Sequence, residues 1–193
     1  MTPPHAAGTR ERIVRATSRL LQRQGYTATG LKEISRASQA TLGSVYHFFP
    51  GGKRELAVAA IRHGDAEFAD LLGEVLARHD DPAEAVAACA EELARGLRES
   101  DWLDGCPVTT AALESAGQLP DIQRAAAEAF AHWRALVADR LATGGLAPEH
   151  AADLAHTVVN TLEGAEMAAQ VARSEEPLRI AGRHLARLVD SYR

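Results

Sequence analysis

Apolar residues recur along most of the chain at intervals of three and four positions, the spacing of an amphipathic α-helix. In residues 10–24 one apolar stripe consists of Ile13, Ala16, Thr17, Leu20 and Leu21. No segment alternates apolar and polar positions as a half-buried strand does. Five prolines each suit the first turn of a helix, namely Pro82, Pro107, Pro120, Pro148 and Pro177. The pattern predicts an all-α protein of about nine helices.

The predicted helices differ greatly in length. Three short ones occupy residues 10–24, 30–37 and 40–48, and a longer one follows at 53–79. The others cover residues 82–99, 107–117, 120–143, 148–167 and 177–189. We expect Thr9 and Thr29 to cap the first two helices, because threonine oxygens accept hydrogen bonds from free N–H groups. Gly25 is expected to end the first helix in the left-handed conformation.

The short helices at 30–37 and 40–48 are separated only by a tight turn at Ser38 and Gln39, the arrangement of a helix-turn-helix. In that motif the second helix enters the major groove of DNA. Pro50, Gly51 and Gly52 then interrupt the chain. We therefore expect a DNA-binding domain at residues 1–52 and a helical bundle for ligand binding and dimerisation at 53–193.

Charge is distributed unevenly, which changes what the overall net charge of −5 implies. Residues 1–55 hold nine lysines and arginines against three glutamates, a net +6, whereas the remainder holds 12 basic and 23 acidic residues, a net −11. A basic segment in an otherwise acidic protein is typical of a segment that binds the phosphates of nucleic acid. The alternative for the basic residues is a solvated helix face.

Small and polar residues in 40–48 fit the chemistry of DNA readout. Thr41, Gly43 and Ser44 allow close approach, and hydroxyl groups bond base edges or phosphates. Tyr46 and His47 end the helix where they reach phosphate oxygens, although Tyr46 also suits the domain core. Further phosphate sites are expected at two predicted helix starts, marked by Lys53 and Thr29.

These residues carry a resemblance to a known family. The stretch from Thr29 to Ile34, followed by Gly43 to Leu56 with its Tyr46-His47-Phe48-Phe49-Pro50-Gly51-Gly52-Lys53 run, resembles the signature of the tetracycline-repressor (TetR) family. The Pro-Gly-Gly-Lys ending, with residues 105–108 and 111–114, resembles its LmrA/YxaF-like branch. The strong likeness covers residues 9–56. Two positions depart from it: Gln39 stands where the turn often has glycine, and Leu42 where the branch usually has a basic residue.

The resemblance implies a repressor that a small apolar or aromatic effector releases from double-stranded operator DNA. It also implies a homodimer formed through the last two helices. By the family pattern the phosphate-contacting positions are Thr29, Tyr46, His47 and Lys53, and the base-facing ones are Thr41, Leu42 and Ser44. Lys32 and Gly43 complete the candidate DNA-binding set.

Aromatic residues are scarce, at 5% of the chain, yet several fall where the ligand cavity is expected. The candidate ligand-binding residues are Phe68, Leu72, Trp102, Cys106, Phe130 and Trp133. The aromatic ones suit the wall of a pocket for a flat ligand, and they equally suit ordinary core packing. Cys106 is either a sensor of oxidants or inert. Asn160, Glu163 and Glu166 interrupt the apolar face of 148–167, either to bond across the dimer interface or to face solvent.

Several functional classes find no support in the sequence. There is no nucleophile elbow, phosphate loop or metal-ligand motif, so neither an enzyme, a cofactor nor a metal site is expected. Residues 1–8 lack the apolar run of a signal peptide, and no span is long enough for a membrane helix, so a cytoplasmic protein is expected. The remaining alternative is a helical small-molecule-binding protein without a DNA role.

Overall fold

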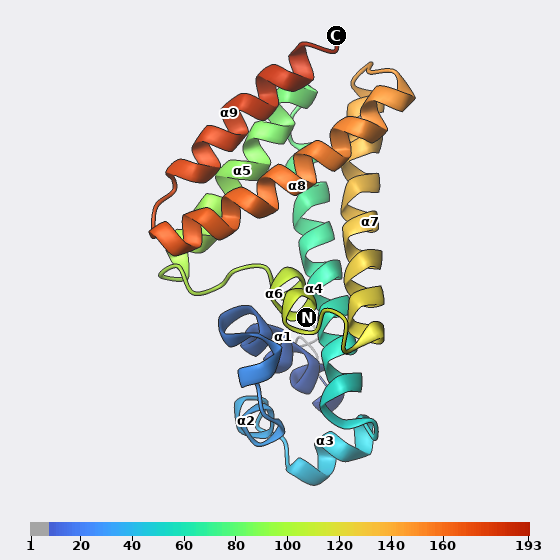
Figure 1. Ribbon diagram of the computed structural model, residues 1–193, viewed down its shortest axis with the longest axis vertical. Helices are drawn as coiled ribbons and strands as arrows, with labels where there is room; N and C mark the ends of the chain where they lie inside the picture. Colours follow the sequence, from blue (N-terminus) through green and yellow to red (C-terminus); the bar gives the residue numbers. More distant parts are fainter. Residues whose placement is uncertain (1–7) are drawn as a thin grey trace, which may run out of the picture. The chain divides into compact units, whose positions relative to one another are not determined.

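The computed structural model describes residues 8–193, in which it contains nine α-helices and no β-strand (Figure 1). This confirms the predicted all-α fold. The helices are α1 (Thr9–Ala28), α2 (Leu31–Ala37), α3 (Leu42–Phe48), α4 (Gly52–Ala77), α5 (Pro82–Glu99), α6 (Pro107–Glu114), α7 (Pro120–Thr143), α8 (Pro148–Ala172) and α9 (Glu176–Asp190). No helix in residues 8–193 is long and apolar enough to cross a membrane. The predicted absence of a signal peptide concerns residues that lie largely outside the described part.

The chain forms two compact units. The first contains the described residues up to Asp65 together with Pro107–Ala126, and the second contains Ala66–Cys106 together with Ala127–Arg193. Helices α4 and α7 therefore each begin in the first unit and end in the second. Residues 8–52, the described part of the expected DNA-binding domain, fall in the first unit, which also takes in α6.

One hydrophobic core holds α1, α2 and α3 together with the start of α4. Its buried members are Ile13, Val14, Ile34, Val45, Phe49 and Leu56. Complete burial of one such side chain contributes about 1.5–3 kcal/mol. Helices as short as α2 and α3, with seven residues each, do not persist alone in water. Their stability therefore comes from this core.

Two predicted helix caps are wrong. Thr9 is the first residue of α1, and the N-cap is Gly8, which has no side chain to accept a hydrogen bond. Gly30 occupies the N-cap of α2, while the Thr29 hydroxyl donates to the carbonyl oxygen of Gly25 at 2.6 Å. Threonine hydroxyls commonly bond back to a carbonyl four residues earlier, and this competes with capping.

Gly25 breaks α1, as predicted, but in a different conformation. Its φ of 74° and ψ of −177° lie outside the left-handed helical region, and the chain then makes another helical turn that ends at Ala28. Few residues other than glycine adopt these angles. The break turns the 26–28 segment so that the Thr27 N–H donates to the Glu114 carboxylate of α6 at 2.7 Å.

The second unit is built around α5, α8 and α9, which pack side by side (Figure 1). Gly182 of α9 allows close approach to α5, since a Cβ there would lie 3.0 Å from that of Ala90. Asp81 caps α5 by accepting hydrogen bonds from the backbone N–H groups of Ala83 and Glu84 at 2.8 and 3.0 Å. Arg140 of α7 donates to the carbonyl oxygens of Leu76, His79 and Asp80 at the end of α4.

Replacing Gly25 with alanine should destabilise the protein by about 1–3 kcal/mol, the cost of holding another residue at such angles. The added Cβ would also meet the Glu114 carboxylate and disturb its bond to Thr27. Chemical denaturation monitored by circular dichroism measures the change. Gly96→Ala is the matched control, because Gly96 lies inside α5 with open space around it, and it should stabilise by about 0.5–1 kcal/mol. Equal effects of the two changes would contradict the strain at Gly25.

Candidate nucleic-acid interface

Helix α3 has one buried face and one open face. Val45 is fully buried, and Phe49, directly after the helix, is 1% exposed, so this side is anchored in the core. On the other side Gly43 and His47 are exposed, and the Tyr46 side chain is 50% exposed. Leu42 and Ser44 are half-buried. The structure thus brings five of the predicted DNA-binding residues onto one short helix with a fixed orientation.

Thr41 and Ser44 together form the start of α3. The Thr41 hydroxyl oxygen accepts a hydrogen bond from the Ser44 N–H at 3.0 Å, and the two hydroxyl oxygens lie 2.9 Å apart. An N-cap of this kind stabilises a helix by about 1 kcal/mol. Both side chains therefore order the helix, and the exposed Thr41 also lies at the end of α3 that enters a groove in helix-turn-helix proteins.

The turn between α2 and α3 contains a strained residue. Gln39 has a φ of 52°, in the left-handed region that glycine adopts more easily. The Ser35 hydroxyl and the Ala40 N–H close the turn, because the hydroxyl donates to the Ala40 carbonyl oxygen at 2.6 Å and the N–H donates back to Ser35 at 3.0 Å. The departure from glycine noted in the sequence thus falls at a position whose backbone favours glycine.

Lys53, expected at a phosphate, is held at the start of α4 by contacts within the first unit. Its Nζ lies 4.2 Å from the centre of the Tyr26 ring and donates to the Thr27 carbonyl oxygen at 3.3 Å. Burial lowers the pKa of Lys53, and the Glu114 carboxylate opposes that shift. The sequence did not indicate that Tyr26 and Glu114 lie beside Lys53, because both are distant from it along the chain.

The two candidates nearer α2 differ in accessibility. Thr29 is 1% exposed and its hydroxyl is engaged by Gly25, so it lies inside the unit and fixes the entry to α2. Lys32 is exposed on α2. The neighbouring Glu33 accepts a hydrogen bond from Gln24 at 2.8 Å, which ties α2 to α1. Of these two candidates, only Lys32 presents its side chain to a partner.

Three of the six ligand-binding candidates form an aromatic cluster in the second unit. The Phe68 and Trp133 ring centres lie 4.7 Å apart with nearly perpendicular planes, and Phe130 lies 5.1 Å from Trp133. Trp133 is only 1% exposed, and its indole N–H has no hydrogen-bond partner among the described residues. A buried donor of this kind usually finds an acceptor, so the cluster contains an unused polar group.

A small cavity of about 10 Å³ adjoins this cluster. Phe68 and Leu72 of α4 line it, together with residues of α5 that include Cys89. Its volume matches about one water molecule, whereas ligand pockets typically measure about 300–1,000 Å³. Trp102 and Cys106 belong to the segment between α5 and α6, where the Trp102 N–H donates to the Leu97 carbonyl oxygen at 2.7 Å.

Comparison with known proteins agrees with this arrangement. Residues 13–60 match the family described as bacterial regulatory proteins, tetR family, and residues 82–184 match the C-terminal domain of LmrA/YxaF-like transcriptional regulators. The uncharacterized HTH-type transcriptional regulator YxaF of Bacillus subtilis is 33% identical over 180 residues, which cover 93% of this chain and 94% of YxaF.

Solved structures share the fold. A regulatory protein TetR from Rhodobacter sphaeroides has a TM-score of 0.83 at 24% identity, covering 93% of this chain and 97% of that one. A cysteine mutant of the TetR-family regulator CifR, complexed with 26 bp of double-strand operator DNA, has a TM-score of 0.79 at 21% identity, covering 96% and 98%.

A helical chain with this helix-turn-helix is a DNA-binding transcriptional regulator. It belongs to the tetR family, and within that family its C-terminal part is LmrA/YxaF-like. Members of the family are transcriptional regulators, not enzymes.

Replacing Gln39 with glycine should stabilise the protein by up to about 1 kcal/mol, because the cost of a left-handed non-glycine residue exceeds the entropy that glycine loses on folding. The melting temperature should rise by about 2–4 °C for each kcal/mol gained. Differential scanning calorimetry measures it. A fall in melting temperature for Gln39→Gly would contradict the argument from strain. Gln118→Gly, in an exposed turn, serves as a control for the general effect of added glycine.

Proposed function

We propose that the protein is a repressor that reads operator DNA with α3 and leaves it when an effector binds the second unit. The observation that carries the DNA part is the open face of α3 opposite the buried Val45. On this proposal Thr41, Leu42, Gly43 and Ser44 face the base pairs. Leucine cannot form the bidentate guanine bond of arginine, but its methyl groups suit a thymine methyl.

Phosphate contacts come from the exposed side chains around α3, namely Tyr46, His47 and Lys32. Phosphate contacts orient a protein on the duplex, whereas base contacts select the sequence. Lys53 and Thr29 act indirectly, because their polar groups are engaged within the first unit. Lys53 retains N–H groups that reach a phosphate if its bond to Thr27 opens.

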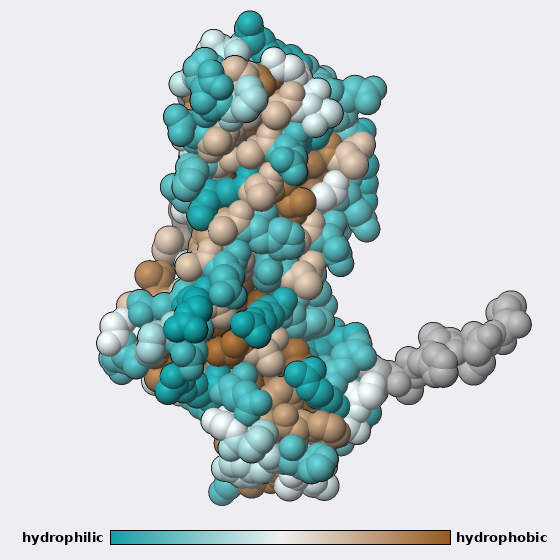
Figure 2. Space-filling view, turned by 90° about the vertical axis from the view of Figure 1, so that its right-hand side faces the viewer, coloured by the Kyte–Doolittle hydropathy of each residue, from teal (hydrophilic) through white to brown (hydrophobic). Residues whose placement is uncertain are grey.

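The regulator is proposed to act as a homodimer through α8 and α9. On the face drawn in Figure 2, hydrophobic residues form narrow strips among hydrophilic ones, so an exposed apolar residue is not unusual by itself. Met167 and Val171, however, are 53% and 83% exposed and lie one turn apart on α8, and Ile180 of α9 is 41% exposed. Two copies would then address half-sites about 34–36 Å apart.

The effector is proposed to enter beside the aromatic cluster. A flat apolar molecule packs against Phe68, Phe130 and Trp133, and an acceptor atom on it satisfies the unpaired indole N–H. Because the adjoining cavity is small, the effector has to separate Phe68 and Leu72 of α4 from α5. Helix α4 continues into the first unit, so the effector favours a state of α4 that differs from the DNA-bound one. Cytoplasmic location follows from action on DNA.

Binding to the DNA upstream of the protein's own gene tests the repressor proposal. Fluorescence anisotropy should give specific binding that weakens steeply with salt, as phosphate contacts require. Lys32→Ala should weaken binding to specific and random DNA alike and lower the salt slope by about 1. Gly43→Ala should reduce specific binding selectively, because the added methyl group points into the groove, while the fold tolerates it.

Arg78→Ala is the matched control, since Arg78 is an exposed basic residue of the second unit that pairs with Glu74 at 3.1 Å. It should leave both the affinity and the salt slope unchanged. Absence of any binding at low salt by a folded protein would instead favour the helical small-molecule-binding protein without a DNA role. A loss with Arg78→Ala equal to that with Lys32→Ala would remove α2 from the interface.

Two negative charges introduced on α8 by substitution test whether this helix forms the dimer interface. Met167→Glu combined with Val171→Glu should raise the dimer dissociation constant by at least about 100-fold, because an uncompensated buried charge costs about 3–5 kcal/mol. Sedimentation equilibrium measures it. Leu113→Glu is the control, since Leu113 is 67% exposed on α6 of the first unit and should leave the dimer intact. An unchanged dimer in the double variant would place the interface elsewhere.

A further inference from the structure

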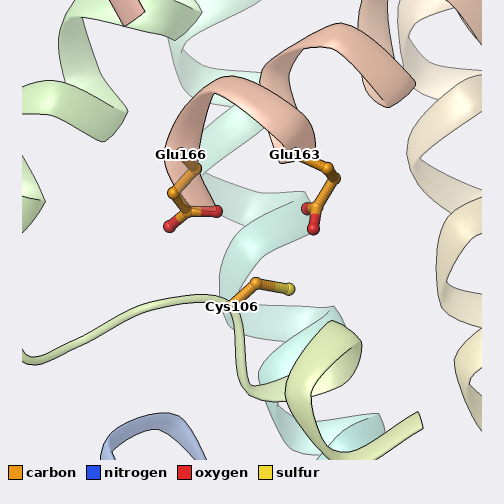
Figure 3. A group of neighbouring side chains, drawn as sticks. All are labelled: Cys106, Glu163 and Glu166. Atoms are coloured by element: carbon orange, nitrogen blue, oxygen red, sulfur yellow. The ribbon is translucent and has the colours of Figure 1, made fainter. Parts of the chain in front are cut away.

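The second unit gathers a thiol and two carboxyl groups that lie far apart in the sequence. Cys106 precedes α6, whereas Glu163 and Glu166 are on α8, and Figure 3 shows the two glutamates pointing from the helix toward the cysteine. The Cys106 sulfur and one carboxylate oxygen from each glutamate all lie within 4.8 Å of one another. Neither a bond across the dimer interface nor exposure to solvent explains this cluster.

The segment that carries Cys106 is fastened along one face of α8. The Gln170 side chain donates to the Leu103 carbonyl oxygen at 3.3 Å, and Arg173 pairs with Asp101 at 2.5 Å. Gly105 lies so close that a Cβ there would fall 2.5 Å from the Gln170 amide oxygen. Glu163, Glu166 and Gln170 share this face because they are three and four residues apart. The position of Cys106 is therefore built into the unit.

Glu166 is the second, independent observation. Its side chain is 8% exposed and points into the cluster, yet no residue in the described range donates a hydrogen bond to its carboxylate. A buried carboxylate without a partner is costly, and coordination of a metal ion is one of the few ways in which proteins satisfy it.

We propose that Cys106, Glu163 and Glu166 bind one divalent transition-metal ion of the zinc type. A thiolate ligand favours zinc over magnesium or calcium, which prefer oxygen ligands alone. Ligand atoms on a tetrahedral zinc ion lie about 3.5 Å apart, so small rotamer changes close the present cluster around it. Three protein ligands leave a fourth position for water or a small anionic ligand. The charge of the ion offsets most of the negative charge of one thiolate and two carboxylates.

Cobalt(II) is the probe, because a thiolate ligand gives a near-ultraviolet charge-transfer band that surface histidines do not produce. The full, untagged chain is stripped with a chelator, reduced and titrated with Co²⁺. One ion per chain should bind with this band, and Zn²⁺ should displace it. Cys106→Ser should abolish the band, and Glu166→Gln should weaken Co²⁺ binding at least tenfold, since even residues that only support a metal ligand cost about 10–100-fold.

Cys89→Ala is the matched control. Cys89 is the other cysteine, and burial within α5 raises its pKa to about 12, so the variant should keep the full band. Circular dichroism checks that every variant is folded, and Glu163→Gln replaces any that is not. No band in the wild-type protein, or a band that persists in Cys106→Ser, would overturn the site. These measurements use no DNA, so failure of the metal site and failure of the repressor proposal are distinguishable.

Discussion

The burial of Val45 and Phe49 against Ile13 and Ile34 is the constraint on which the DNA-binding unit depends. A helix of seven residues forms too few internal hydrogen bonds to offset its nucleation cost, so α3 exists only because one side is packed. The same packing determines which side remains open. Since a helix turns 100° per residue, fixing Val45 inward fixes Gly43 and His47 outward. A single core thus sets both the stability of the helix and the side of it that remains exposed.

The succession of helices could be predicted because it is written in local signals. Pro82, Pro107, Pro120 and Pro148 each open a helix, and the apolar spacing between them extends over many turns. Helix caps were harder, because a hydroxyl has several backbone partners within reach: Thr29 bonds back to Gly25, and Thr41 caps α3 instead. The positive φ of Gly25 was predictable from its residue type, but the hydrogen bond between Thr27 in the further turn and Glu114 joins segments that are distant in the sequence.

Contacts between distant segments were beyond the sequence. Lys53 matched the expected motif, yet nothing in the spacing of residues indicates that Tyr26 and Thr27 receive its ammonium group. Only some of the aromatic ligand-binding candidates lie together. Phe68, Phe130 and Trp133 are on the long helices α4 and α7 and form one cluster, whereas Trp102 lies in the irregular segment between α5 and α6. Cys106 and Glu166 are sixty positions apart, so no ligand spacing could reveal their proximity.

The second unit retains polar groups that a purely structural core would avoid. Trp133 keeps a buried donor without a partner, and Glu166 keeps a buried carboxylate. Each weakens the unbound protein, and on the two proposals above each is relieved by a bound molecule of complementary chemistry, an acceptor for the first and a cation for the second. In a regulator an unsatisfied buried group is useful, because a ligand shifts the equilibrium between two states only if its affinities for the two states differ.

A core whose polar groups already had partners inside the protein would bind effectors weakly in every state. Helix α4 carries Phe68 in the second unit and Leu56 in the core of the first, so on the proposed mechanism the effector acts through this helix on the packing that orients α3. If the effector disfavours DNA binding as proposed, linkage requires that DNA bound to α3 disfavours the effector to the same degree.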